Sequence, residues 1–186
     1  MNIKELCESL ECNPVIAAFQ ENGWYEAIES PAKILFCLKA KIKTVAEMIA
    51  KAHEAGKIVF IHIDLAEGIG KDRDGIEFLA SSCADGIIST RSQLIRVAKD
   101  CGLATVQRFF ALDSKGLEGI SEMAASCKPD MREIMPGVLG KVLKRFANKP
   151  YPVIAGGLVE TKAEVTEALS QGASAVSTGK RELWYM

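Results

Sequence analysis

The sequence predicts a compact (β/α)₈ barrel that forms a single domain over residues 1–186, and three observations support this fold. Short apolar runs recur eight times along the chain. Amphipathic segments lie between them. Glycine, proline or aspartate bounds the runs, which is typical of parallel strands buried on both faces. Eight such units favour a closed barrel over an open flavodoxin-like sheet, the alternative that the same alternation allows.

The expected strands are rich in valine, isoleucine and phenylalanine. In chain order they cover residues 14–19, 33–38, 58–64, 85–90, 104–110, 131–137, 152–157 and 173–179. Each run is short enough to cross a small barrel once. Because consecutive parallel strands need a crossover connection, a helix is expected after each of them.

Four of the connecting segments show helical periodicity with a clear stop signal. In residues 44–55, apolar side chains recur at helical spacing and Gly56 follows. The segments 91–101, 115–127 and 161–171 end in the same way, before Gly102, Pro129 and Gly172. These helices would form the outer ring of the barrel.

The end of the chain is unusual for a barrel. Only residues 180–186 follow the eighth run, so the last helix is expected to be truncated or missing. The exposed flank of the eighth strand then needs another cover. We expect the amphipathic start to provide it, together with a second copy of the chain. The apolar face of that start consists of Ile3, Leu6, Cys7 and Leu10.

Composition restricts the classes of partner. The formal net charge is -1, so no global field attracts the chain to nucleic acid or to an anionic membrane, and an RNA-binding surface must be a local patch. The 6 cysteines show no metal-ligand spacing, so we expect reduced thiols and no metal or cofactor. Without a secretory signal or an apolar run of about 18 residues, the expected location is cytoplasmic.

The seventh and eighth runs end in glycines and hydroxyl side chains. Gly156 and Gly157 close the seventh run, and Ser177, Thr178 and Gly179 close the eighth. Glycines allow backbone N–H groups to approach an anion closely, and these two loops hold a phosphate in many barrels. We therefore predict a phosphate-binding site here. The alternative is that the glycines serve only tight turns.

Other polar residues are predicted to line the same end of the barrel. Because side chains alternate along a strand, His62 and Asp64 share one face, and Gln107, Arg108 and Glu133 occupy comparable positions. Asp64 and Glu133 would accept hydrogen bonds from ligand hydroxyls, and Arg108 would pair with a phosphate or a carboxylate. The same two carboxylates also suit an acid–base pair, which leaves an enzyme as the alternative.

The fourth run passes directly into a helix. Ser89 or Thr90 would cap that helix, and Arg91 would reach over the barrel mouth. We include Thr90 and Arg91 among the candidate ligand-binding residues. A simple N-cap with a solvated Arg91 is the alternative.

Two basic groups are candidates for RNA contact. The first contains Lys141, Lys144 and Arg145, in the acid-free stretch 138–150 that also holds Lys149. The second places Lys180 and Arg181 beside Trp184 and Tyr185. Cations with stacking aromatics are typical of single-stranded RNA binding. A solvated helix and an aromatic cover for the eighth strand are the alternatives.

Several motifs together resemble one family. They are Gly56-Lys57, His62-Ile-Asp-Leu-Ala-Glu-Gly-Ile69, Asp72-x-x-Gly75-Ile-Glu-Phe-Leu79, Gly86-Ile-Ile-Ser-Thr-Arg-Ser92, Gln107-Arg-Phe-Phe-Ala-Leu-Asp113, Lys128-Pro-Asp130, Glu133-Ile-Met-Pro-Gly137, Pro152-Val-Ile-Ala-Gly-Gly157, Gly172-Ala173 and Leu183-Trp184. From about Pro14 onward the chain is similar to the glycerol-3-phosphate-responsive antiterminators of glycerol uptake operons. The resemblance implies a barrel that binds glycerol 3-phosphate and acts on leader mRNA to prevent transcription termination.

Two rival functions stay open at this point. One is an isomerase or synthase of a phosphorylated small metabolite, with Asp64 and Glu133 as acid and base. The other is a metabolite-binding protein with no role on RNA. A barrel fold alone does not separate them, because barrels host many functions.

Overall fold

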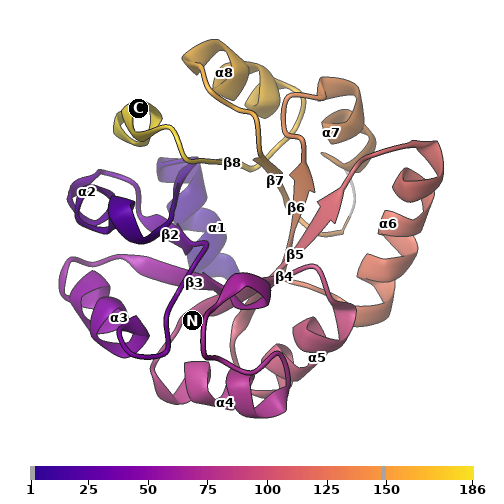
Figure 1. Ribbon diagram of the computed structural model, residues 1–186. Helices are drawn as coiled ribbons and strands as arrows, with labels where there is room; N and C mark the ends of the chain where they lie inside the picture. The colour runs from indigo at the N-terminus through magenta and orange to yellow at the C-terminus, as the bar shows by residue number, and fades with distance from the viewer. Residues whose placement is uncertain (1–2, 148–149) are drawn as a thin grey trace.

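Eight parallel strands close into a barrel in the order β1 to β8, and β1 pairs with β8 to complete the ring (Figure 1). The computed structural model describes residues 3–147 and 150–186. The predicted (β/α)₈ fold is therefore confirmed, and the open flavodoxin-like sheet is excluded by the β1–β8 pairing.

The strands lie within the predicted runs. They are β1 (Val15–Phe19), β2 (Ile34–Cys37), β3 (Ile58–His62), β4 (Gly86–Ser89), β5 (Ala104–Phe110), β6 (Met131–Met135), β7 (Val153–Gly156) and β8 (Ala175–Thr178). The third strand ends earlier than predicted, at His62, because residues Ile63–Leu65 turn into the short 3₁₀ helix η2. Strict alternation of side chains therefore stops before Asp64.

Helices connect consecutive strands. They are α2 (Trp24–Glu29, after the 3₁₀ turn η1, Glu21–Gly23), α3 (Val45–Glu54), α4 (Arg73–Ser81), α5 (Ser92–Asp100), α6 (Ser114–Cys127), α7 (Gly140–Ala147) and α8 (Lys162–Ser170). Side-chain caps fix several starts: Asp113 accepts from the Gly116 N–H before α6, and Thr161 and Glu164 form a capping box on α8. No helix in the described ranges is long and apolar enough to cross a membrane.

The amphipathic start forms helix α1 (Ile3–Cys12), and it closes one end of the barrel. Leu6 and Leu10 are buried in the inner apolar cluster with Phe36 and Phe60, whose rings lie 5.6 Å apart. In Figure 1, α1 lies behind the ring of strands. The prediction that this segment covers the flank of the eighth strand is wrong, because the open lower end of the barrel interior offers its apolar face more buried surface. The side chain of Ile3 lies outside those described.

A single 3₁₀ helix, η3 (Arg181–Tyr185), replaces the eighth covering helix. Leu183 and Trp184 are buried beneath it, and the Trp184 indole Nε1 donates to the Thr178 carbonyl at 2.8 Å. The prediction of a truncated last helix is thus confirmed. Because η3 covers this flank, a second subunit is not needed to shield it.

Candidate functional site

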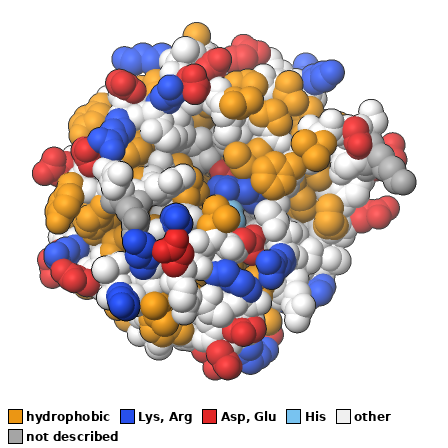
Figure 2. All heavy atoms as spheres, viewed as in Figure 1, with side chains coloured by type: hydrophobic (Ala, Val, Ile, Leu, Met, Phe, Trp, Pro, Cys, Tyr) orange, Lys and Arg blue, Asp and Glu red, His pale blue; other side chains and the backbone are white. Residues whose placement is uncertain are grey.

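A polar layer lies directly above the apolar interior of the barrel. Side chains alternate along each strand, so Phe60, Val106, Met131 and Ala175 point inward in the inner cluster. The inward positions two residues later hold His62, Arg108, Glu133 and Ser177. Figure 2 shows basic side chains and a histidine in the hollow at the centre of this face. The interior therefore changes from apolar to polar where the strands end.

Glu133 is the centre of this layer and is fully buried. Arg108 Nε donates to its Oε2 at 2.6 Å, and Ser177 Oγ donates to its Oε1 at 2.5 Å. A Cβ on Gly156 would lie 2.4 Å from the same Oε1 atom. Gly156 thus makes room for the Glu133 carboxylate, and it does not itself line the cavity above.

A cavity of about 350 Å³ opens above Arg108 and Glu133, at the ends of β7 and β8. Gly157, Gly179 and Lys180 line it. Among the described residues, neither Gly157 nor Gly179 donates a backbone N–H hydrogen bond outside the strand ladders. Gly157 has a φ of 74°, a conformation that glycine adopts without strain. The two glycines therefore bring the backbone of both loops to the wall of the cavity.

The hydroxyl groups of this region are already used within the protein. Ser177 donates to Glu133, and Thr178 Oγ1 donates to the Val159 carbonyl at 2.7 Å while accepting from the Lys180 N–H at 3.1 Å. Thr178 lines the cavity but fixes the loop. The candidate donors for a ligand are the backbone N–H groups of the two glycines, the terminal nitrogens of Arg108 and the Lys180 ammonium, whose Nζ also lies 3.4 Å from Glu160 Oε1. This set suits an anion of phosphate size.

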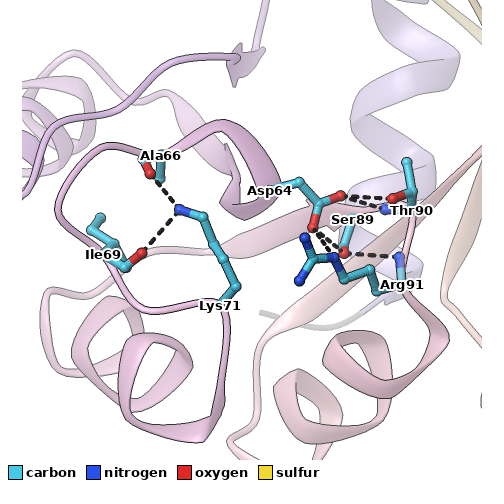
Figure 3. A network of polar contacts seen from close by, with 7 residues as sticks. All are labelled: Asp64, Ala66, Ile69, Lys71, Ser89, Thr90 and Arg91. Atoms are coloured by element: carbon cyan, nitrogen blue, oxygen red, sulfur yellow. Dashed lines mark hydrogen bonds and ion pairs between the residues drawn. The ribbon is translucent and has the colours of Figure 1, made fainter.

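Asp64 belongs to a different cluster, between β3 and β4 (Figure 3). Its carboxylate accepts from Ser89 Oγ at 2.9 Å and from the N–H and Oγ1 of Thr90 at 2.7 and 3.0 Å. Arg91 Nε lies 3.7 Å from Oδ1. Lys71 Nζ is held nearby by the carbonyls of Ala66 and Ile69. None of Asp64, Thr90 and Arg91 lines the cavity at β7 and β8.

His62 lies between these two groups. Burial lowers its pKa below the usual value of 6.5, and the positive charge of Arg108 lowers it further, while Asp64 and Glu133 act in the opposite direction. The imidazole is therefore neutral at pH 7. Gln107, which the sequence placed with these residues, faces outward instead. It donates to Ser92 Oγ at 2.9 Å, because alternation along β5 turns it away from Arg108.

Both carboxylates proposed as an acid–base pair are engaged by hydrogen-bond donors. Glu133 is held by Arg108 and Ser177, and Asp64 by the Ser89–Arg91 segment. None of the eight strands contains a lysine that would form a Schiff base inside the barrel. Among the described residues, no group of three or more histidine, cysteine, aspartate or glutamate side chains is arranged to hold a metal ion.

The two basic groups differ in their surroundings. Lys141, Lys144 and Arg145 are exposed on α7, whose apolar side chains are buried against the barrel. Lys149 lies outside the described residues. In the second group Trp184 is only 1% exposed and its indole is bonded to the end of β8, which agrees with the alternative that it is an aromatic cover for the eighth strand. Arg181 pairs with Glu26.

Sequence reasoning missed two roles. Lys180, a predicted RNA-binding residue, lines the cavity instead. Its Nζ atom lies 3.4 Å from Glu160 Oε1. Its position directly after Gly179 is a signal that was present in the sequence. Arg132 is buried on the outer face of β6, where Nη2 donates to the carbonyls of Phe146 and Tyr151. Because side chains alternate along a strand, the sequence predicts that the adjacent residues Arg132 and Glu133 face opposite sides of β6.

Taken together, the fold and the site define a small TIM barrel with a polar cavity at the ends of β7 and β8. Residues 15–184 match the family model described as glycerol-3-phosphate responsive antiterminator, and the chain belongs to that family.

Two solved structures are similar to this chain along most of both lengths. The glycerol uptake operon antiterminator regulatory protein from Listeria monocytogenes is 32% identical, with a TM-score of 0.86 over 92% of this chain and 95% of that one. A glycerol uptake operon antiterminator-related protein from Thermotoga maritima is 36% identical, with a TM-score of 0.83 over 92% and 98%.

Two further comparisons are of different kinds. The uncharacterized Escherichia coli protein YgcP is 37% identical over 182 residues, which are 96% of this chain and 95% of YgcP. The deoxyribose phosphate aldolase from Aeropyrum pernix, with 12% identity and a TM-score of 0.69, shares the fold alone.

Proposed function

We propose that this chain is a cytoplasmic transcription antiterminator that binds glycerol 3-phosphate and acts on the leader mRNA of glycerol utilisation operons. Membership of a glycerol-3-phosphate responsive family supports the regulatory class. The observation that carries the proposal is the cavity at β7 and β8, where the backbone of Gly157 and Gly179 converges with Lys180 and Arg108.

In the proposed complex, the phosphate lies on the N–H groups of Gly157 and Gly179 and attracts Lys180. The glycerol end points inward, to Arg108 and Glu133. Ser177 and Thr178 act indirectly, by holding Glu133 and the β8 loop. Gly156 supports the site by packing.

The cluster of Asp64, Thr90 and Arg91 takes a supporting position in this proposal, at the opposite rim of the mouth. The Asp64 carboxylate already accepts three hydrogen bonds there, so we assign it to the order of the β3 and β4 loops. Arg91 is half-exposed and remains able to reach an anion that enters the mouth.

Titration calorimetry with glycerol 3-phosphate tests the pocket. Gly179→Asp places a carboxylate where the phosphate would lie, and its Cβ would meet no atom closer than the Ala18 carbonyl oxygen at 3.6 Å. We expect at least about tenfold weaker binding from charge repulsion. Gly157→Asp should act in the same direction, with added strain from its positive φ and from Met135.

Gly119→Asp is the matched control, since it adds the same charge on α6, where the nearest atom to its Cβ is Met123 Cε at 3.8 Å. This variant should bind like the wild type. Equal affinity for the wild type and Gly179→Asp would reject the pocket.

For RNA, we propose that the exposed face of α7, with Lys141, Lys144 and Arg145, contacts the phosphate backbone.

Hydrogen bonds connect the loop before α7 to the lining of the cavity. The Gly137 N–H, in the loop before α7, donates to the carbonyls of Gly156 and Gly157 at 2.6 and 3.0 Å. A ligand on Gly157 would therefore bias the position of α7. Such coupling typically changes affinity by about 5- to 150-fold. Lys180 and Arg181 are not part of this surface, because Lys180 lines the cavity and Arg181 pairs with Glu26.

A filter-binding assay with a labelled leader transcript from the chain's own genome tests this surface. Lys144→Glu should weaken binding and lower the salt dependence by about one phosphate contact. Lys162→Glu, an exposed lysine on α8, is the matched control. Binding that is unaffected by glycerol 3-phosphate and by Lys144→Glu would contradict the RNA role and favour a metabolite-binding protein.

Self-association remains a separate proposal. Phe110, Leu112 and Leu158 are exposed at the ends of β5 and β7, which is the kind of apolar rim that a second copy of the chain would cover. Light scattering tests this directly: a monomeric mass with and without glycerol 3-phosphate would remove it.

A further inference from the structure

His62 is the polar group of the barrel interior whose hydrogen bonding is incomplete. Its side chain is 3% exposed, and its Nδ1 atom is one of two buried side-chain nitrogen or oxygen atoms in the described residues that have no hydrogen-bond partner. The other, Nε of Arg132, lies on the outer face of the barrel, where the same guanidinium makes two bonds. Buried polar atoms are nearly always paired, so Nδ1 of His62 indicates a partner outside the chain.

His62 does not itself line the proposed cavity, but two of its neighbours in the polar layer do. It lies in the same inward layer as Arg108 and Glu133, which line that cavity, and the charges of both residues act on its imidazole. Arg108 makes its only hydrogen bond in the described residues through Nε, so its terminal nitrogens are not committed. A ligand group that displaces the end of Arg108 would reach the layer in which His62 lies.

The chemistry of the partner follows from the state of the imidazole. In a neutral histidine one ring nitrogen donates and the other accepts, and which one is Nδ1 depends on the tautomer. A hydroxyl group satisfies either form, because it both donates and accepts. A phosphate or carboxylate satisfies only a donor, and it would stand beside the carboxylate of Glu133. The layer therefore favours the hydroxyl end of a polyol phosphate.

We propose that His62 is a specificity-determining residue, whose Nδ1 forms a hydrogen bond to a hydroxyl of the bound polyol phosphate. This inference rests on the proposed function, because it assumes that the phosphate lies at Gly157 and Gly179. It adds a second contact, which distinguishes glycerol 3-phosphate from phosphate esters of similar size without hydroxyls.

Titration calorimetry with three probes tests the proposal: glycerol 3-phosphate, n-propyl phosphate, which lacks both hydroxyls, and inorganic phosphate. We expect the wild type to prefer glycerol 3-phosphate over n-propyl phosphate by about tenfold or more, as one or two hydrogen bonds would give. His62→Phe, which keeps a ring but no hydrogen-bonding atom, should lose most of that preference while it binds n-propyl phosphate as before. His62→Asn, whose amide lies near the position of Nδ1, should restore part of it.

The controls separate the two proposals. His53→Gln changes the other histidine, which lies on α3 beside Asp85, and should leave all three affinities unchanged. No binding of any probe to the folded wild type would overturn the proposed function itself. Binding of glycerol 3-phosphate with the same preference in His62→Phe as in the wild type would overturn only the role of His62.

A spectroscopic readout keeps the test independent of affinity. With ¹⁵N-labelled histidine, the His62 ring nitrogens give signals that the His62→Asn spectrum assigns. Addition of glycerol 3-phosphate should shift the Nδ1 resonance, and n-propyl phosphate should shift it much less. Identical shifts with the two esters would contradict a hydroxyl contact.

Discussion

Two buried arginines on neighbouring strands have opposite surroundings. Arg108 faces the barrel interior, pairs with Glu133 and opens on the cavity, whereas Arg132 faces outward and is 1% exposed. Arg132 has no carboxylate partner among the described residues. Its Nη2 donates to two backbone carbonyls, and its guanidinium lies 5.2 Å from the Phe146 ring centre and 5.7 Å from that of Tyr151.

The difference follows from the alternation of side chains along a strand, which directs one arginine to the candidate site and the other to the packing of the helices. The register pairs Arg108 with Glu133 and Gln107 with Arg132, so one arginine is assigned to the interior and the other to the α7 side. Arg132 uses its planar group to attach α7 and the chain before β7 to the barrel. Arg108 bonds to Glu133 through Nε, and its terminal nitrogens make no hydrogen bond among the described residues. The substitutions below test this separation.

The largest effect is expected at Arg108. Arg108→Met leaves the carboxylate of Glu133 fully buried without its cation, which should lower the free energy of unfolding by about 3 kcal/mol. It should also abolish glycerol 3-phosphate binding. Urea denaturation and calorimetry measure the two effects, and Arg108→Lys should recover part of each. A stable variant that binds normally would contradict the assignment of Arg108 to the site.

Arg132→Met should lower stability without changing the site. It removes a charged donor from two carbonyls and two ring contacts, for an expected loss of about 2 kcal/mol in the free energy of unfolding. Glycerol 3-phosphate affinity should stay within about twofold. The comparison between the two arginines would fail if this variant lost the ligand as Arg108→Met is expected to do.

Asp64→Asn extends the comparison to the other rim of the mouth. The amide turns one acceptor into a donor facing Ser89 and Thr90, so stability should fall by about 1.5 kcal/mol. Ligand affinity should change by less than about threefold, because Asp64 does not line the cavity. A loss of tenfold or more would mean that the ligand reaches the β3–β4 cluster. Turnover of a triose phosphate that disappears in this variant would instead favour an enzyme.

Much of this arrangement follows from the sequence. The eight strands, the truncated last helix and the convergence of Gly157, Thr178 and Gly179 on one cavity were predictable, because parallel strands bring their carboxyl ends to one face. The surface against which α1 packs was not predictable, because an amphipathic face shows that a helix is buried but not which surface buries it. Gln107 and Arg108 are adjacent on β5 and therefore face opposite sides, but the sequence contains no fixed inward residue that shows which of the two lines the interior. The burial of Trp184 was one of two alternatives that the sequence left open, because an aromatic side chain suits both a stacking surface and a cover for an exposed strand.

The smallest expected effect is a pH dependence that reports on His62. Burial and the charge of Arg108 lower the pKa of its imidazole, against the opposing effect of Asp64 and Glu133. Above pH 6.5 the imidazole is neutral in both the folded and the unfolded chain, so its contribution to stability is fully present. As the pH falls below 6.5, the unfolded chain takes up a proton that the folded chain resists, and stability declines until the lower, folded-state pKa is passed.

His62→Asn removes this titration. Between pH 7.5 and 5.5 the wild type should therefore lose about 1 kcal/mol more of its free energy of unfolding than the variant, as measured by urea denaturation. Bound glycerol 3-phosphate should make the free energy of unfolding of the wild type depend more strongly on pH. The ligand adds a hydrogen bond to the neutral imidazole, and protonation of the folded protein would break it. Parallel pH profiles for the two proteins would show that His62 is solvated in the folded chain. The interior polar layer would then be open to water, and Nδ1 would need no ligand hydroxyl as its partner.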